Sequence, residues 1–224
     1  MRTISVGHSP DADDIFMYYA IKFGWVSLPK VKFENIALDI ETLNQATLKG
    51  IYDICAISFA LYPFVKDDFA LLKTAVSFGE GYGPKLIKKK GIKLKKNFKV
   101  ALSGEFTTNA LLFKIAYPDA RISYMNFLDI ENAVINGDVD AGVLIHESIL
   151  TYSSVLEVER EIWDIWVELC NGEELPLPLG GMCLRRSITL TEAIKYENAL
   201  IKAVDVANKN RKTLAPILLE KGLI

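Results

Sequence analysis

His146 is the side chain in this sequence that is best placed to move a proton. It is one of two histidines among 224 residues, and it directly follows the apolar run AGVLI at 141–145. That run predicts a buried strand, so we expect His146 where the strand ends and a helix begins. Histidine has the unperturbed pKa that lets a side chain accept a proton near neutral pH. His146 is therefore the candidate general base, and the alternative is a hydrogen bond to a ligand or to a nearby hydroxyl.

Hydroxyl and amide side chains follow the ends of other predicted strands. These residues are Ser58, after the predicted strand at 53–57, and Thr107, Thr108 and Asn109, after the predicted strand at 98–102. In open α/β sheets, ligands bind outside the carboxyl ends of the strands. Hydroxyls and free backbone N–H groups at helix starts are good partners for carboxylates. For Ser58, Thr107 and Thr108, ordinary helix capping is the alternative.

The segment HSPDADD at 8–14 follows the first predicted strand, at 3–7. Ser9 and Asp14 are binding candidates in this turn, whereas His8 either caps and lines the turn or contacts a ligand. The helix macrodipole favours acidic residues at a helix start without any further function. Three nearby carboxylates are also a pattern for a hard metal ion. Their spacing is not that of a calcium loop, so we expect no metal.

Strand and helix patterns alternate along most of the chain, which predicts an α/β fold of mostly parallel sheets flanked by helices. The predicted strands are 3–7, 31–38, 53–57, 69–75, 85–89, 98–102, 122–124, 142–145 and 182–186. The predicted helices are 11–23, 40–49, 58–65, 107–117, 128–136, 157–170, 191–208 and 212–221. The glycine-rich segment at 77–84 is expected to be a loop that allows close approach to a ligand. The segment LPLPLGG at 175–181 is expected to be irregular, because its prolines remove backbone donors.

Two segments, 90–98 and 172–181, are predicted to be linkers between two lobes. The first lobe would consist of residues 1–91 and 180–224, and the second lobe of residues 92–179. A cleft between lobes joined by two linkers can close over one small polar molecule.

The overall composition argues against several classes of protein. The 26 basic and 28 acidic residues give a net charge of −2, which offers no broad attraction for nucleic acid or for an anionic membrane surface. The start MRTISVGHSP is not that of a secretory signal, and no stretch is long enough to span a bilayer. The three cysteines fit neither a disulfide framework nor a zinc site. We expect a cytoplasmic protein, either a monomer or a homodimer.

Several blocks of sequence resemble the 1,4-dihydroxy-6-naphthoate synthase family of the futalosine route to menaquinone (vitamin K2). They appear in order between residues 5 and 186: GHSPDADDIFMYYAI, LDIETLNQATLKGIYDICAISFALY, FGEGYGP, LSGEFTTNALL, DAGVLIHESILTY and LPLPLGGMCLRR. Together the blocks are specific to that family. The resemblance implies a two-lobed fold like that of the type 2 periplasmic binding proteins, in a cytoplasmic carbon–carbon lyase.

The resemblance also implies a reaction and a set of site residues. The substrate would be cyclic dehypoxanthine futalosine, a small-molecule carboxylate, and the products 1,4-dihydroxy-6-naphthoate and a fragment such as dihydroxyacetone. His146 matches the family's proton-accepting histidine. Ala56, Ile57 and Ser58 match one substrate-binding stretch, and Thr108 and Asn109 match a second. No cofactor is expected.

The chain departs from the family in two places. Many members read SPCPNDTF where this chain reads SPDADDIF, which keeps Asp14 but changes the residues around it. Related enzymes are also expected to continue for some tens of residues after the helix ending near Lys221. The alternative functions are the sister chorismate dehydratase, which shares the fold, and a small-molecule binding protein without catalysis.

Overall fold

The computed structural model describes residues 1–222, apart from the side chain of Asp13. The chain divides into two compact units. Unit 1 contains Met1–Ile57, Tyr62–Val76 and Gly181–Ile224, and unit 2 contains Ser58–Leu61 and Ser77–Gly180. In the described part of the chain, no helix is both long enough and apolar enough to cross a membrane.

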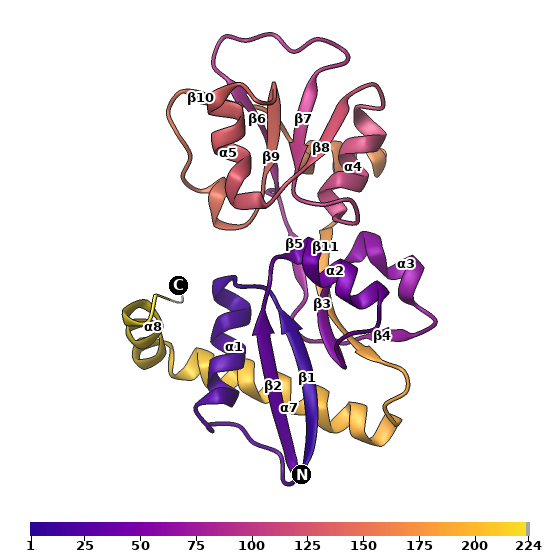
Figure 1. Ribbon diagram of the computed structural model, residues 1–224, viewed down its shortest axis with the longest axis vertical. Helices are drawn as coiled ribbons and strands as arrows, with labels where there is room; N and C mark the ends of the chain where they lie inside the picture. The colour runs from indigo at the N-terminus through magenta and orange to yellow at the C-terminus, as the bar shows by residue number, and fades with distance from the viewer. Residues whose placement is uncertain (223–224) are drawn as a thin grey trace. The chain divides into compact units, whose positions relative to one another are not determined.

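The first sheet combines a parallel part with antiparallel strands (Figure 1). Its order is β2 (Val31–Ala37), β1 (Arg2–His8), β3 (Ile54–Ser58), β11 (Leu177–Arg185) and β4 (Phe69–Leu71), and β5 (Ser77–Gly79) also pairs with β11. Strand β1 runs parallel to both β2 and β3. Strand β11 runs antiparallel to β4 and β5. The parallel strands therefore end at one edge, where the 8–14 turn begins.

The helices of unit 1 follow the predicted segments closely. They are α1 (Ala12–Lys22), α2 (Ile40–Leu48), α3 (Tyr62–Val65, after the 3-10 turn η1 at Phe59–Leu61), α7 (Leu190–Lys209) and α8 (Arg211–Glu220). Helix α7 packs against α1. The Tyr196 ring of α7 meets Phe33 of β2 edge-on, with ring centroids 5.9 Å apart. This apolar contact fixes α7 on the sheet.

The second sheet also combines parallel and antiparallel strands. Its order is β10 (Leu156–Glu161), β6 (Lys85–Lys89), β9 (Ala141–Leu144), β7 (Lys99–Leu102) and β8 (Arg121–Tyr124). Strand β7 is parallel to β8 and β9, whereas β6 is antiparallel to β9 and β10. Its helices are α4 (Thr108–Ala116), α5 (Phe127–Asn136) and α6 (Ile162–Leu169), with a 3-10 turn, η2, at His146–Ile149.

The prediction of one helix over 157–170 is wrong, because its first part is strand β10. Leu156 and Val158 pack against a hydrophobic core cluster, and the glutamates alternate with them. Glu157 and Glu159 both pair with Lys88 on the neighbouring strand, at 3.5 and 2.6 Å from its Nζ. This alternation has the two-residue period of a strand. The cross-strand ion pairs further stabilise the pairing of β10 with β6.

The predicted division of the chain after residue 91 also differs from the structure. The long segment of unit 2 begins at Ser77, so β6 belongs to the second sheet and not to the first lobe. The predicted linker at 90–98 lies between β6 and β7 of the same sheet and therefore does not join the two units. The lysines of β6 are bound by antiparallel pairing to β9 and β10, which a sequence pattern alone does not reveal.

The segments at 77–84 and 175–181 contain more regular structure than predicted. Ser77–Gly79 is the short strand β5, and β11 already begins at Leu177, with a register shift between Pro178 and Gly180. A proline is tolerated beside such an irregularity because a ladder hydrogen bond is already absent there. Gly79 is required by close approach, because a Cβ atom would lie 2.1 Å from the carbonyl oxygen of Tyr82. This glycine therefore serves a tight turn.

Close packing between β9 and α5 sets the position of the strand that carries His146. A Cβ atom on Gly142 would lie 2.4 Å from a methyl group of Ile130 and 3.1 Å from one of Val134. Both of these α5 residues are fully buried in the same cluster as Leu144. Only glycine allows the helix to lie this close to the strand, so the end of β9 is held firmly.

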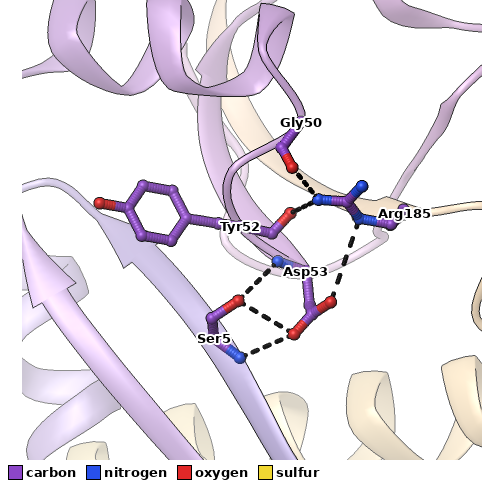
Figure 2. Close-up of polar contacts among 5 residues, drawn as sticks. All are labelled: Ser5, Gly50, Tyr52, Asp53 and Arg185. Atoms are coloured by element: carbon purple, nitrogen blue, oxygen red, sulfur yellow. Dashed lines mark hydrogen bonds and ion pairs between the residues drawn. The ribbon is translucent and has the colours of Figure 1, made fainter.

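A polar cluster joins β1, the start of β3 and the end of β11 in unit 1 (Figure 2). The Asp53 carboxylate accepts hydrogen bonds from the Ser5 backbone N–H and hydroxyl, both at 2.9 Å. Arg185 donates to the carbonyls of Gly50 and Tyr52, and its Nε lies 4.0 Å from Asp53. The cluster fixes strand β3 beside β1.

Asp53→Ala is expected to lower the free energy of unfolding by about 1–3 kcal/mol, because it removes two charge-assisted hydrogen bonds to Ser5. Urea unfolding followed by circular dichroism measures the change. Asp67→Ala, at an exposed position, is the matched control and is expected to have little effect. An equal loss in the two variants would contradict this role for Asp53.

Candidate active site

Three parallel strands of the second sheet deliver polar groups to one edge. Strands β8, β7 and β9 lie side by side in parallel. The chain leaves them into the start of α5, the start of α4 and the turn η2, respectively. Because the carboxyl ends of parallel strands share an edge, these three starts are neighbours, as the sequence predicts.

His146 begins η2 with a left-handed backbone, at φ 54°. Such a conformation is uncommon outside glycine, although histidine adopts it more readily than most residues. The side chain is half-buried, and its imidazole meets the Phe127 ring edge-on, with centroids 5.1 Å apart. The predicted helix after β9 is a single 3-10 turn. His146 therefore packs against the Phe127 ring at the edge of the sheet and is still partly accessible to solvent.

Thr107 is the N-cap of α4. Its hydroxyl accepts from the Ala110 N–H at 3.3 Å and donates to the Gly104 carbonyl at 3.0 Å. These two bonds are those of an ordinary cap. The first turn of α4 contains no acidic residue, so its N–H groups and helix dipole offer an uncompensated site for an anion.

Thr108 ties together three segments of unit 2. Its hydroxyl donates to the Leu179 carbonyl at 2.8 Å and accepts from the Ala60 N–H at 3.3 Å. The second contact brings the segment that begins at Ser58 next to the start of α4. Ser58 itself is 4% exposed. Of the first predicted binding stretch, Ser58 therefore lies in the same unit as Thr108, two residues before its partner Ala60.

Asn109 has a buried acceptor that no described residue satisfies. Its amide nitrogen lies 3.3 Å from the Ser103 hydroxyl, but its carbonyl oxygen has no hydrogen-bond partner. The side chain is only 6% exposed. Buried polar atoms without a partner are rare and call for an explanation. A ligand that donates a hydrogen bond would supply one here.

The remaining candidates belong to unit 1 and are grouped at the ends of β1 and β3. The Ser9 N–H donates to the Asp14 carboxylate at 2.8 Å, and the Ser9 hydroxyl accepts from the Asp11 N–H at 3.3 Å. Ala56 and Ile57 are buried in β3. Asp14 also contributes to the lining of a cavity of about 380 Å³ between α1, α7 and the segment at 74–76. Ser9 and Asp14 therefore form a closed turn at the start of α1.

Two further residues at these edges were not foreseen as functional. Phe127 contacts His146, and Asn35 of β2 contacts His8, with 3.0 Å between the amide nitrogen and Nε2. The position of Phe127 just after the predicted strand at 122–124 could have identified it by the same rule that identified His146. Asn35 carries no such signal, because it lies within a strand. No group of three or more His, Cys, Asp or Glu side chains in the described residues is arranged to hold a metal ion.

A family model for menaquinone biosynthesis matches residues 4–224. The chain belongs to the menaquinone biosynthesis family. Curated relatives of this family include the 1,4-dihydroxy-6-naphthoate synthase of Thermus thermophilus, which is 31% identical over 92% of this chain and 72% of its own length. The enzyme of the same name from Streptomyces coelicolor is 30% identical over 97% of this chain and 78% of its own length.

Solved structures place this family member in the two-lobed fold of periplasmic binding proteins. A protein from Archaeoglobus fulgidus is 37% identical, with a TM-score of 0.86 over 93% of this chain and 78% of that one. The periplasmic aliphatic sulphonate binding protein of Escherichia coli has a TM-score of 0.68 at 13% identity, over 100% of this chain and 80% of that one. This second likeness concerns the fold alone.

Thr108→Val is expected to destabilise the protein by about 1–2 kcal/mol, because it leaves the Leu179 carbonyl and the Ala60 N–H without their shared partner. Thermal or urea unfolding measures the loss. Thr108→Ser keeps the hydroxyl and is expected to retain most of the stability. If serine and valine were equally damaging, packing of the methyl group and not the hydroxyl would be the cause.

Proposed function

We propose that this chain is a carbon–carbon lyase that converts cyclic dehypoxanthine futalosine to 1,4-dihydroxy-6-naphthoate, with His146 as the general base. The single observation that carries the assignment of the base is the position of His146, which is half-exposed, left-handed at φ 54° and held against Phe127. Membership of the menaquinone biosynthesis family supports the substrate. The names of the two curated synthases point to the same product.

The proposed reaction needs one base and a site that excludes water. His146 takes a proton from the substrate, and a carbon–carbon bond then breaks with release of the small fragment. Formation of the aromatic naphthalene makes this outcome favourable. Histidine is the residue type suited to accept a proton at neutral pH, and the edge contact with Phe127 keeps the imidazole in one orientation.

We place the substrate carboxylate at the start of α4 and not at the start of α1. The first turn of α4 has no acidic residue, so the helix dipole and free N–H groups attract an anion there. The start of α1 carries Asp11 and Asp14, which would repel a carboxylate. Ser9 and Asp14 of unit 1, and Ser58, remain binding candidates whose side chains suit hydroxyl groups and not a carboxylate.

Asn109 is proposed to accept a hydrogen bond from a substrate hydroxyl through its buried carbonyl oxygen. Thr107 and Thr108 support this contact by fixing the start of α4 through the backbone bonds described above. The proposed compartment is the cytoplasm, because Cys55, Cys170 and Cys183 are all free and free thiols suit a reducing environment.

His146→Gly and His146→Asn are both expected to lower kcat by about 10²–10⁴-fold, because each removes a general base. Glycine and asparagine tolerate the left-handed backbone at this position, so both variants are expected to fold. Release of the naphthoate, followed by mass spectrometry, measures the rate.

Added imidazole distinguishes a lost base from a disturbed site. It is expected to restore activity to His146→Gly, which leaves a space at an accessible position, and to restore much less to His146→Asn. Full activity in either variant without imidazole would contradict the assignment of the base.

Asn109→Ala is expected to raise KM about tenfold, equivalent to about 1.4 kcal/mol, with little change in kcat, because it removes one hydrogen bond to bound substrate. Steady-state kinetics measure both constants. Asn136→Ala, at an exposed position on α5, is the control. A fall in kcat with unchanged KM would instead mean that Asn109 acts on the transition state.

A further inference from the structure

His8 is the second histidine of the chain, and its surroundings differ from those of His146. It ends β1 and is 1% exposed, so it cannot meet solvent or substrate directly. The Tyr18 ring of α1 stacks on the imidazole, with centroids 4.3 Å apart and planes inclined by 19°. The proposed chemistry leaves this buried and ionisable group without a role.

The hydrogen bonds of His8 determine which nitrogen carries the proton. Its Nδ1 lies 2.6 Å from the Ser9 carbonyl oxygen, which can only accept, so Nδ1 carries the hydrogen. Its Nε2 lies 3.0 Å from the amide nitrogen of Asn35, which donates. The imidazole therefore accepts at Nε2 and is neutral in this arrangement.

The imidazole connects β2 to the turn that contains the predicted binding residues. Asn35 of β2 holds one side of the ring, and Ser9 is held on the other. The Ser9 N–H then donates to Asp14 at 2.8 Å, and the Ser9 hydroxyl accepts from Asp11. The Ser9 carbonyl is thus held by His8, and the Ser9 N–H and hydroxyl are held by the start of α1.

We propose that His8 is a positioning residue, whose neutral imidazole links the Ser9–Asp14 turn to Asn35 of β2, and whose protonation breaks this link at Nε2, while the Nδ1–H bond to Ser9 remains, and weakens substrate binding. The proposal rests on the proposed function, because Ser9 and Asp14 are taken to contact substrate. Protonation would place a hydrogen on Nε2, facing the amide hydrogens of Asn35. The Asn35 amide would then have to turn round, which disturbs the contact between β2 and the turn.

The groups around His8 favour its neutral form. Burial lowers the pKa of His8 below its ordinary value of 6.5, and the positive charge of Lys22 on α1 lowers it further, against the opposing effect of the Ser9 carbonyl. Tyr18 of α1 is neutral because burial raises the pKa of its phenol. Cys55 on the adjacent strand β3 is also neutral, since burial raises the pKa of its thiol to about 12. Asn35 on β2 carries no charge, and the acidic groups at the start of α1 are Asp11 and Asp14, of which Asp14 binds Ser9.

The first test measures the tautomer and the titration of each of the two histidine rings by nuclear magnetic resonance. Protein labelled with ¹⁵N-histidine gives ring signals for His8 and His146 alone, and His146→Asn assigns them. We expect His8 to stay in the Nδ1–H form and to titrate below the usual 6.5, because burial disfavours its charged form. Titration at or above that value, or an Nε2–H form, would overturn the proposal.

The second test measures substrate binding without turnover. Cyclic dehypoxanthine futalosine is titrated by calorimetry into His146→Asn between about pH 5 and pH 8. We expect Kd to rise by up to about tenfold per pH unit below the pKa of His8. In His8→Phe/His146→Asn, where a ring of similar size keeps the stacking, we expect a weak and pH-independent Kd. This double variant also controls for ionisation of the substrate.

The outcomes separate this proposal from the proposed function. Tight binding with the same pH dependence in both proteins would overturn the role of His8 and leave the function intact. A Kd that does not vary with pH in His146→Asn would do the same. No binding at any pH would overturn the proposed function and this proposal together.

Discussion

The close packing of α5 on β9 is the constraint on which the candidate site depends. Gly142 lets Ile130 and Val134 lie directly against the strand, where any Cβ atom would collide with them. Strand β9 is wholly buried between β6 and β7. Two residues after the carboxyl end of this strand comes His146, whose backbone is left-handed. The buried strand thereby fixes the backbone that leads to the candidate base His146, and the His146 ring contacts Phe127, the first residue of the same helix α5.

The predicted binding residues at the start of α4 and those at the start of α1 lie in surroundings of different charge. Helix α4 begins with Thr107 as a cap and has no acidic side chain in its first turn, so its dipole is available to an anion. Helix α1 begins among carboxylates, which already bind the Ser9 turn. The start of α4 therefore suits an anion, and the start of α1 does not.

Much of the fold could be predicted from residue patterns, because buried strands and capped helices have local signals. The segments at 3–7, 53–57 and 98–102 are apolar runs followed by polar helix starts, and each contains a strand of the structure. Strand β10 was not foreseen, since its glutamates become favourable only beside Lys85 and Lys88 of β6. The division at Ser77 depends on the same pairing, which joins residues far apart in the chain. Within the candidate site, the sequence pattern predicted that His146 and Asn109 follow the ends of strands, and they do. No local pattern could show that the Asn35 side chain would contact His8.

Conversion of substrate by the wild-type chain tests the account most directly. The purified protein is incubated separately with cyclic dehypoxanthine futalosine and with chorismate, and the products are followed by mass spectrometry. The account predicts that 1,4-dihydroxy-6-naphthoate accumulates over many turnovers and that chorismate remains unchanged. Dehydration of chorismate, or binding of the futalosine derivative without any naphthoate, would contradict it.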